Sequence, residues 1–180
     1  KLLDVDNTFT YKNVQSRTIG NKPPVGICGT GVVEITSELV RNEIVDENGL
    51  LEDEYFDDGF PIYKTDEDTI RFTQKDVREI QLAKAAIRAG MDTLILRYGI
   101  TYEEIDTIYL AGGFGYKIDV EKAAYIGLLP KELVGKIKAI GNSSLEGAFR
   151  YLLDANGQER IENIISRSKE IGLSTDKDFH

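Results

Sequence analysis

The sequence predicts a mixed α/β fold in which crossover connections join parallel strands. From residue 73 onward the pattern runs helix, strand, glycine turn, helix, strand, glycine turn, helix, which is the order of such folds. Both strand segments are short and apolar, and each passes directly into glycine. With 180 residues, 41% of them hydrophobic, the chain can bury a real core, and we expect one domain over residues 1–180.

The first part of the chain predicts short strands and one buried helix. Two β-like runs, 11–14 and 17–19, come first, and Pro23-Pro24 then stops regular structure. Apolar residues with helical spacing follow Gly31 and predict a helix with one buried face: Val32, Ile35, Thr36, Leu39 and Val40. Asn48-Gly49 marks the turn after it.

An acidic segment lies between Glu47 and Asp68. Its carboxylates lack the spacing of an EF-hand loop, so the segment is expected to be a solvated excursion. Its charge also makes it a candidate docking surface. Edge strands are predicted within and after it, at 60–64 and 69–72. The acidic residues concerned are Glu52, Asp53, Glu54, Asp57, Asp58, Asp66, Glu67 and Asp68.

The longest predicted helix begins after Thr73, a good N-cap residue with Asp76 three positions later. Gly99 supplies its stop, and Thr101 with Glu104 caps a short turn after it. The helix carries an apolar stripe with helical spacing: Val77, Ile80, Ala83, Ile87, Met91, Leu94 and Ile95.

Two strand-to-helix turns follow. The strand 107–111 runs into Gly112-Gly113-Phe114-Gly115, and Asp119 opens the next helix, which Gly127 and Pro130 end. The strand 136–140 then ends at Gly141-Asn142, and Ser143 with Glu146 reads as a capping box for a further helix. A last amphipathic helix holds Ile161, Ile164 and Ile165, and residues 172–180 are expected to fray.

Composition excludes several classes of function. A net charge of −9 repels phosphate backbones and anionic lipid, so we expect no nucleic acid and no membrane as partners. The single cysteine, Cys28, rules out an all-cysteine metal cluster within one chain and reads as a small buried packing residue. The only histidine, His180, ends the chain. No catalytic and no metal-ligating residue is predicted, and the chain is expected to be cytoplasmic.

The glycine turns are the candidate binding site. Ligands of α/β folds bind where strands pass into helices, and glycine lets a ligand press directly on the backbone. Two readings stay open, because a glycine pair after a strand also makes a simple tight turn. Gln81 and Lys84 are either solvated or reach a ribose or phosphate. Neither the Walker-A pattern nor the dinucleotide fingerprint is present.

Five segments in one order resemble the C-terminal part of the reductive activators of corrinoid proteins. They are Val25–Gly31, Thr73–Ile87, Leu110–Gly115, Ile126–Pro130 and Gly141–Ala148. These activators are ATP-dependent iron–sulfur proteins that return inactivated cobalamin to its cobalt(I) state for methyl transfer. The resemblance covers most of residues 25–153.

The resemblance implies half of an actin-like ATPase fold, which is ribonuclease H-like with a mixed sheet and helices on both faces. Two such halves flank a nucleotide cleft in the superfamily of acetate and sugar kinases, actin and heat-shock ATPases. Leu110–Gly115 is similar to the adenosine motif, Gly141–Ala148 to the second connecting motif, and Gly29–Gly31 to the first hinge. The implied nucleotide-binding residues are Gly29, Thr30, Gly31, Gln81, Lys84, Gly112, Gly113, Phe114, Gly115, Gly141, Asn142 and Ser143.

The resemblance also implies cofactors and partners that belong to a longer, intact protein. ATP with magnesium is expected in the intact protein, and a [2Fe–2S] cluster in the parent and not in this chain. The chain then reads as a fragment whose partner is a corrinoid protein of a methyltransferase system, with a homodimer left open. Alternatives are an activator of another reductase or dehydratase, half of a small-molecule kinase, and a non-catalytic dimerisation or docking module.

Overall fold

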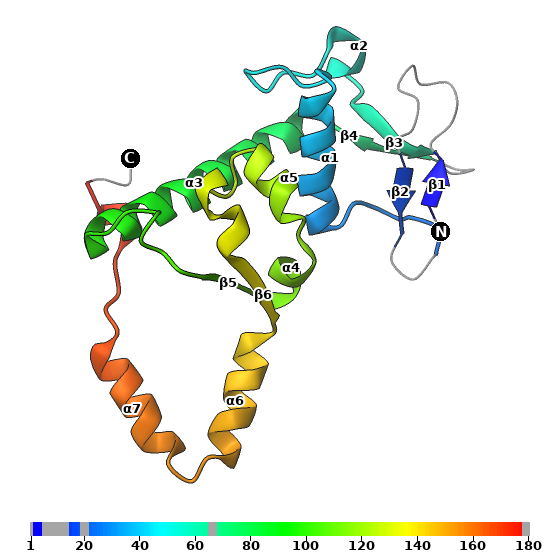
Figure 1. The fold of residues 1–180 in the computed structure, drawn as a ribbon. Coiled ribbons are helices and arrows are strands. Elements are labelled where there is room, and N and C mark those ends of the chain that lie inside the picture. Colours follow the sequence, from blue (N-terminus) through cyan, green and yellow to red (C-terminus); the bar gives the residue numbers. More distant parts are fainter. Residues whose placement is uncertain (1, 5–14, 19–21, 65–67, 178–180) are drawn as a thin grey trace. The chain divides into compact units, whose positions relative to one another are not determined.

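The computed structural model describes residues 2–4, 15–18, 22–64 and 68–177 (Figure 1). The predicted run at 11–14 lies outside these residues, as do Ile19 and the acidic residues Asp66 and Glu67. The chain forms two compact units, Lys1–Lys84 and Ala85–His180, and each is described by itself.

The first unit joins two small antiparallel sheets with helices. Strand β1 (Leu2–Asp4) pairs with β2 (Gln15–Arg17), and β3 (Phe60–Lys64) pairs with β4 (Thr69–Phe72). The β3 and β4 bounds confirm the predicted edge strands. The helices are α1 (Gly29–Arg41), α2 (Asp53–Phe56) and the first part of α3 (Gln74–Tyr98).

The predicted helix after Gly31 is confirmed as part of α1: Thr36 and Leu39 are buried, and the other predicted face residues, Val32, Ile35 and Val40, are partly buried against the core. Val33 and Ser37, which the prediction left out, are buried as well. Helix α1 begins earlier than the sequence indicated. Gly29 to Gly31 form its first turn instead of a loop before it, and Cys28 is its N-cap without a side-chain cap hydrogen bond.

The core of the first unit lies between α1, the β3–β4 pair and the start of α3. Its most deeply buried large side chain is Phe72, which is 0% exposed. The other members each expose less than a tenth of their surface: Leu39, Ile44, Val45, Leu51, Tyr55, Phe60, Ile62 and Val77.

The start of α3 confirms the predicted capping box. Asp76 accepts hydrogen bonds from the Thr73 amide and hydroxyl at 2.8 and 2.7 Å, and the Thr73 hydroxyl accepts from the Asp76 amide at 3.3 Å. At the other end, Gly99 has φ +78° and its amide donates to the Ile95 carbonyl, which is the expected helix stop.

The second unit contains a parallel strand pair with helices after each strand. Strand β5 (Ile108–Ala111) leads into α4 (Gly112–Lys117) and α5 (Val120–Tyr125). A 3-10 helix, η2 (Lys131–Lys136), precedes β6 (Ile137–Gly141). Helices α6 (Ser143–Leu153) and α7 (Gly157–Arg167) and the 3-10 turn η3 (Leu173–Thr175) follow. Among the described strands, the pairs form three separate two-stranded sheets, two antiparallel and one parallel.

Two local predictions in this unit are confirmed and two are wrong. Asp119 caps α5 by accepting from the Lys122 amide at 3.0 Å, and Gly127 after that helix has φ +79°. Ser143, however, is the first residue of α6 and not its cap. The chain end does not fray as far as Asp176, whose carboxylate binds the Arg97 guanidinium through contacts of 2.9 and 2.7 Å.

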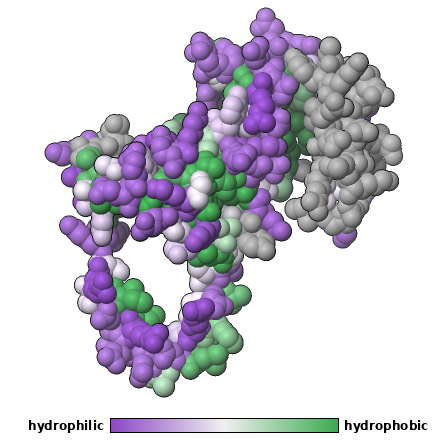
Figure 2. Space-filling view, viewed as in Figure 1, coloured by the Kyte–Doolittle hydropathy of each residue, from purple (hydrophilic) through white to green (hydrophobic). Residues whose placement is uncertain are grey.

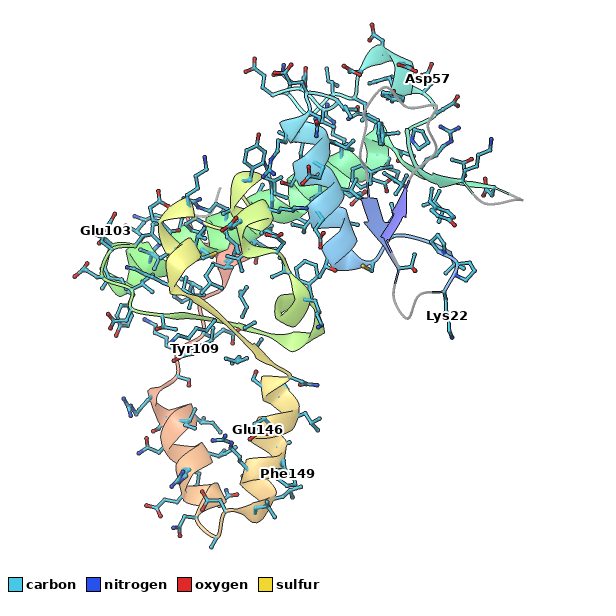
Figure 3. All side chains as sticks on the ribbon, turned by 45° about the vertical axis from the view of Figure 1, so that its right-hand side comes forward. Lys22, Asp57, Glu103, Tyr109, Glu146 and Phe149 are labelled. Atoms are coloured by element: carbon cyan, nitrogen blue, oxygen red, sulfur yellow. The ribbon has the colours of Figure 1, made fainter. Side chains whose placement is uncertain are left out.

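Helix α6 buries none of its residues within the described chain. Figure 2 shows hydrophobic surface over α6 and α7, and Figure 3 labels Phe149 on α6. Leu145, Leu152 and Leu153 are each about 70% exposed or more, at 68%, 78% and 71%. An apolar face of this kind marks a contact surface on a soluble protein.

Phe72→Ala is expected to lower the free energy of unfolding by about 3–5 kcal/mol, because it removes a fully buried ring and leaves a cavity. Phe56→Ala, at a ring that is 45% exposed, should cost less than about 1 kcal/mol. Urea denaturation followed by circular dichroism compares the two variants. Equal losses of stability would contradict the assignment of the core.

Candidate functional site

The candidate site lies where β5 and β6 end. The two strands pair in parallel, and Ala111 at the end of β5 lies opposite Gly141 at the end of β6. The turns that follow therefore lie together at one edge, as the sequence predicted for adjacent strands (Figure 1). This edge, residues 111–115 and 141–145, is called the glycine edge below.

Glycine is required at two of these positions by the backbone. Gly112 has φ +89° and Gly141 has φ +70°, a left-handed conformation that a side chain would strain. Gly113 has an ordinary φ, and a Cβ placed there would meet no atom within 4 Å. The fold itself therefore leaves space at Gly113 for a ligand to approach the backbone.

The segment after β5 is a helix and not the open turn that the sequence suggested. Gly112 to Gly115 belong to α4, and its N-cap Ala111 makes no side-chain cap hydrogen bond. After β6, the Asn142 side-chain oxygen accepts from the Leu145 amide at 3.1 Å, so Asn142 is the cap of α6. Two helix N-termini thus begin at the glycine edge, and the amides of a helix start favour phosphate or ribose oxygens.

Ser143 and Glu146 do not form the predicted capping box. Ser143 is half-buried at the first position of α6, and Glu146 instead accepts from Arg150 at 2.7 Å. The Ser143 hydroxyl therefore has no cap role to fill, and its contribution to nucleotide binding stays a prediction.

Gly115 is explained by packing. It is buried, and a Cβ there would lie 3.1 Å from Leu110 Cβ and 3.2 Å from its carbonyl carbon. A glycine at this position lets α4 fold back against β5. The neighbouring Phe114 side chain is 48% exposed at the same helix.

The other predicted nucleotide-binding residues belong to the first unit. The Gln81 side chain has two hydrogen bonds there. Its Oε1 accepts from Arg78 on the same helix at 2.6 Å, and its Nε2 donates to the carbonyl of Asn48 in the neighbouring turn at 3.4 Å. Glycine is favoured beside it by the left-handed backbone of Gly49, whose φ is +76°. Lys84 is half-buried on the same helix, and Gly29, Thr30 and Gly31 lie in the first turn of α1.

Cys28 is exposed, so its assignment as a buried packing residue was wrong. Its Sγ lies 3.4 Å from the Thr30 hydroxyl. This hydrogen bond, together with the Gly31 amide, lowers the pKa of the thiol. Val25, three residues before Cys28, is fully exposed as well.

A polar cluster that the sequence did not reveal holds the opposite ends of the strands. The Tyr102 hydroxyl donates a hydrogen bond to the Asp92 carboxylate. The same carboxylate accepts from the Arg88 Nε at 3.2 Å. The Arg88 guanidinium lies 5.5 Å from the centre of the Tyr102 ring. Lys136, next to β6, donates to the Glu103 carbonyl at 2.8 Å. The cluster fixes the connection into β5 and takes no part in the glycine edge.

The residues at the glycine edge fit a nucleoside better than a metal. Open backbone at Gly113 and the two helix starts suit a base, ribose or phosphate oxygen. Across the residues that the structure describes, no three His, Cys, Asp or Glu side chains are placed to hold a metal ion. A single cysteine does not fit a [2Fe–2S] cluster. In the same part of the chain, no helix is long and apolar enough to span a membrane.

The model of the C-terminal domain of RACo, described as the ASKHA domain, matches residues 3–180. This chain belongs to that family. The resemblance inferred from the sequence is thereby confirmed, and so is the α/β ASKHA fold class. The ASKHA domain named by this family model has the actin-like ATPase architecture.

Similar proteins act on corrinoid proteins. The chain is 36% identical over 182 residues to the corrinoid activation enzyme RamQ of Eubacterium limosum, covering 89% of this chain and 30% of that protein. It is 32% identical over 152 residues to the [Co(II) methylated amine-specific corrinoid protein] reductase of Methanosarcina barkeri, covering 82% and 25%. A solved reductive activator for corrinoid, iron–sulfur protein superimposes with a TM-score of 0.81 at 32% identity, covering 91% and 28%. The chain thus spans about a third or less of the length of each.

Asn142→Ala should lower the free energy of unfolding by about 1 kcal/mol, because the amide of Leu145 loses its acceptor. Ser143→Ala, one position later, should change the free energy of unfolding by less than about 0.5 kcal/mol in either direction, since Ser143 is not the cap and alanine is a good helix former. Thermal unfolding of the two variants measures the difference. A larger loss for Ser143→Ala would restore serine as the cap.

Tyr102 is expected to titrate late. Burial, and then the hydrogen bond to Asp92, raise its pKa to about 12, so both favour the neutral phenol. The stabilisation from this contact is therefore full below the ordinary tyrosine pKa of about 10 and is lost as pH rises through about 12. Ultraviolet titration of the chain against Tyr102→Phe isolates this phenol, and Asp92→Asn should bring its pKa down. A phenol that titrates near pH 10 would contradict the contact.

Proposed function

We propose that this chain is the nucleotide-binding C-terminal part of a reductive activator for a corrinoid protein. The observation that carries the proposal is the meeting of two glycine turns and two helix starts at one edge of the β5–β6 pair. The names of the similar proteins support the reaction class, because each acts on a corrinoid protein.

In this proposal the base and ribose of ATP lie against the backbone at Gly112 and Gly113. The positive φ of Gly112 turns the chain sharply out of β5, and the open space at Gly113 admits the ligand. The amides that begin α4 and α6 orient ribose or phosphate oxygens. ATP with magnesium supplies the free energy of binding and hydrolysis in the intact protein.

The chain alone is expected to bind nucleotide weakly and not to turn it over. A triphosphate needs groups on both walls of a cleft to hold it in line for transfer. The similar proteins are about three to four times longer than the segment matched here, which supports a second wall in a longer protein. The exposed apolar face of α6 supports the same arrangement, because such a face is stable when another part of a protein covers it.

The activator reaction we propose adds one electron to cobalt(II) of the bound corrinoid and gives cobalt(I). The electron comes from a [2Fe–2S] cluster in the longer protein, and the contribution of this part is conformational. Nucleotide binding favours one arrangement of the two walls, and the corrinoid protein bound to that arrangement is the more easily reduced. The partner is then a corrinoid protein of a cytoplasmic methyltransferase system, and a homodimer remains open.

Titration of MgATP and MgADP against the chain, by isothermal calorimetry, tests the binding step. We expect saturable binding in the millimolar range, and we expect Gly113→Val to abolish it. Valine at this position meets no atom of the fold with its Cβ, so a loss of binding reports on the ligand contact.

Gly135→Val is the matched control, because Gly135 also has open space around its Cβ and lies in η2, outside the glycine edge. Its affinity should equal that of the parent chain. Binding that survives Gly113→Val would place the nucleotide elsewhere. Absence of binding both here and in a full-length activator that contains this part would favour the docking module.

A further inference from the structure

The acidic segment of the first unit forms an open hollow with an apolar floor. The hollow has a volume of about 630 Å³ and is lined by Glu43, Asp46, Leu50, Leu51, Glu52, Asp53, Glu54 and Phe56. Phe56 is 45% exposed and Leu50 is 39% exposed, so apolar surface faces solvent between the carboxylates. Figure 3 labels Asp57, which follows Phe56 at the end of α2.

The charge of the chain is concentrated on this segment. Residues 42–63 hold eight acidic and no basic side chains, so they account for eight of the nine net negative charges of the sequence. The acidic residues are all exposed: Glu43, Asp46, Glu47, Glu52, Asp53, Glu54, Asp57 and Asp58. No salt bridge among the described residues uses any of these carboxylates.

Two nearby arginines bind the segment without pairing with its carboxylates. Arg78 donates to the Asn48 carbonyl at 3.2 Å, and Arg71 donates to the Gly59 carbonyl at 3.0 Å. Both guanidinium groups thus bind the backbone of the segment and not its carboxylates. Apart from Asp46, which accepts from the amides of Asn48 and Leu50, these carboxylates can therefore pair with positive charges of an approaching partner.

The hollow is held in shape from below, while its acidic side chains are exposed to solvent, as the sequence predicted. Leu51 is 3% exposed and Tyr55 is 6% exposed, and both belong to the core. The Gln74 side chain fixes the turn from both sides, accepting from the Leu51 amide at 2.8 Å and donating to the Gly49 carbonyl at 2.7 Å. Asp46 closes the same turn by accepting from the amides of Asn48 and Leu50.

We propose that this hollow docks a basic segment of a partner protein, with one apolar side chain of that segment inserted against Phe56 and Leu50. Charge complementarity selects the partner, since a hollow lined by five acidic and no basic side chains attracts lysine and arginine and repels nucleic acid and anionic lipid. Burial of the exposed Phe56 ring against the partner slows dissociation of the complex. A metal ion is not the occupant we choose, because these carboxylates form no described group placed for one.

The test uses fluorescence anisotropy with a short labelled peptide of lysine and alanine that carries one central phenylalanine. The whole chain should bind this probe, and affinity should fall steeply with added salt. The triple variant Glu52→Gln, Asp53→Asn, Glu54→Gln should weaken binding about tenfold, the loss expected for three exposed ion pairs.

Two controls separate a docking surface from simple charge attraction. The first control neutralises three exposed acids of the second unit: Glu159→Gln, Glu162→Gln and Glu170→Gln. It changes the net charge by the same amount and should leave the affinity for the probe unchanged. Phe56→Ala should weaken the phenylalanine probe about fivefold and should not change binding of a probe with serine in place of the phenylalanine.

Three outcomes would overturn the proposal. Equal losses in the two triple variants would mean attraction to net charge alone. An unchanged affinity in Phe56→Ala would remove the apolar anchor. Saturable calcium binding that displaces the probe and is lost in the Glu52–Asp53–Glu54 variant would make the hollow a cation site. Circular dichroism of every variant distinguishes these outcomes from unfolding, and nucleotide binding at the glycine edge should be unaffected throughout.

Discussion

The candidate site depends on the parallel pairing of β5 with β6. Because Ala111 lies opposite Gly141, both strands end at the same level, and the helices that follow start side by side. The left-handed backbone at Gly112 and Gly141 makes each exit sharp enough for this. Slipping the register by one residue would separate the two turns and reverse which strand residues face each side. The Tyr102–Asp92–Arg88 cluster and Lys136 hold the other ends of the strands and so help to keep that register.

The glycines of the chain serve different physical ends, and the structure distinguishes them. Gly112 and Gly141 are needed for their left-handed backbone, and Gly115 is needed for its close packing on Leu110. Neither reason applies to Gly113. Gly113 lies at the glycine edge, so a side chain missing there leaves room for a ligand, whereas Gly135 has similar open space away from that edge. For this reason Gly113 carries more of the functional argument than its neighbours in the same motif.

Local signals allowed most elements to be predicted from the sequence. The Thr73–Asp76 capping box, the Gly99 stop and the Asp119 cap are contacts within a few residues, and each formed as expected. Asn142 and Ser143 are both good caps, so the sequence could not choose between them. The Arg97–Asp176 pair joins residues 79 apart, and no local pattern announces it. For the site, the sequence predicted that the two turns belong together. The register, the α4 helix and the hydrogen bond of Gln81 to the Asn48 carbonyl needed the three-dimensional fold.

The most direct test of the account is amide hydrogen exchange of the chain with and without MgATP, at a nucleotide concentration that saturates binding. The account predicts that protection increases at residues 111–117 and 141–145 together, since the ligand spans two turns that the strand pairing places side by side. Protection confined to one turn, or located away from both, would contradict the glycine edge as the nucleotide site.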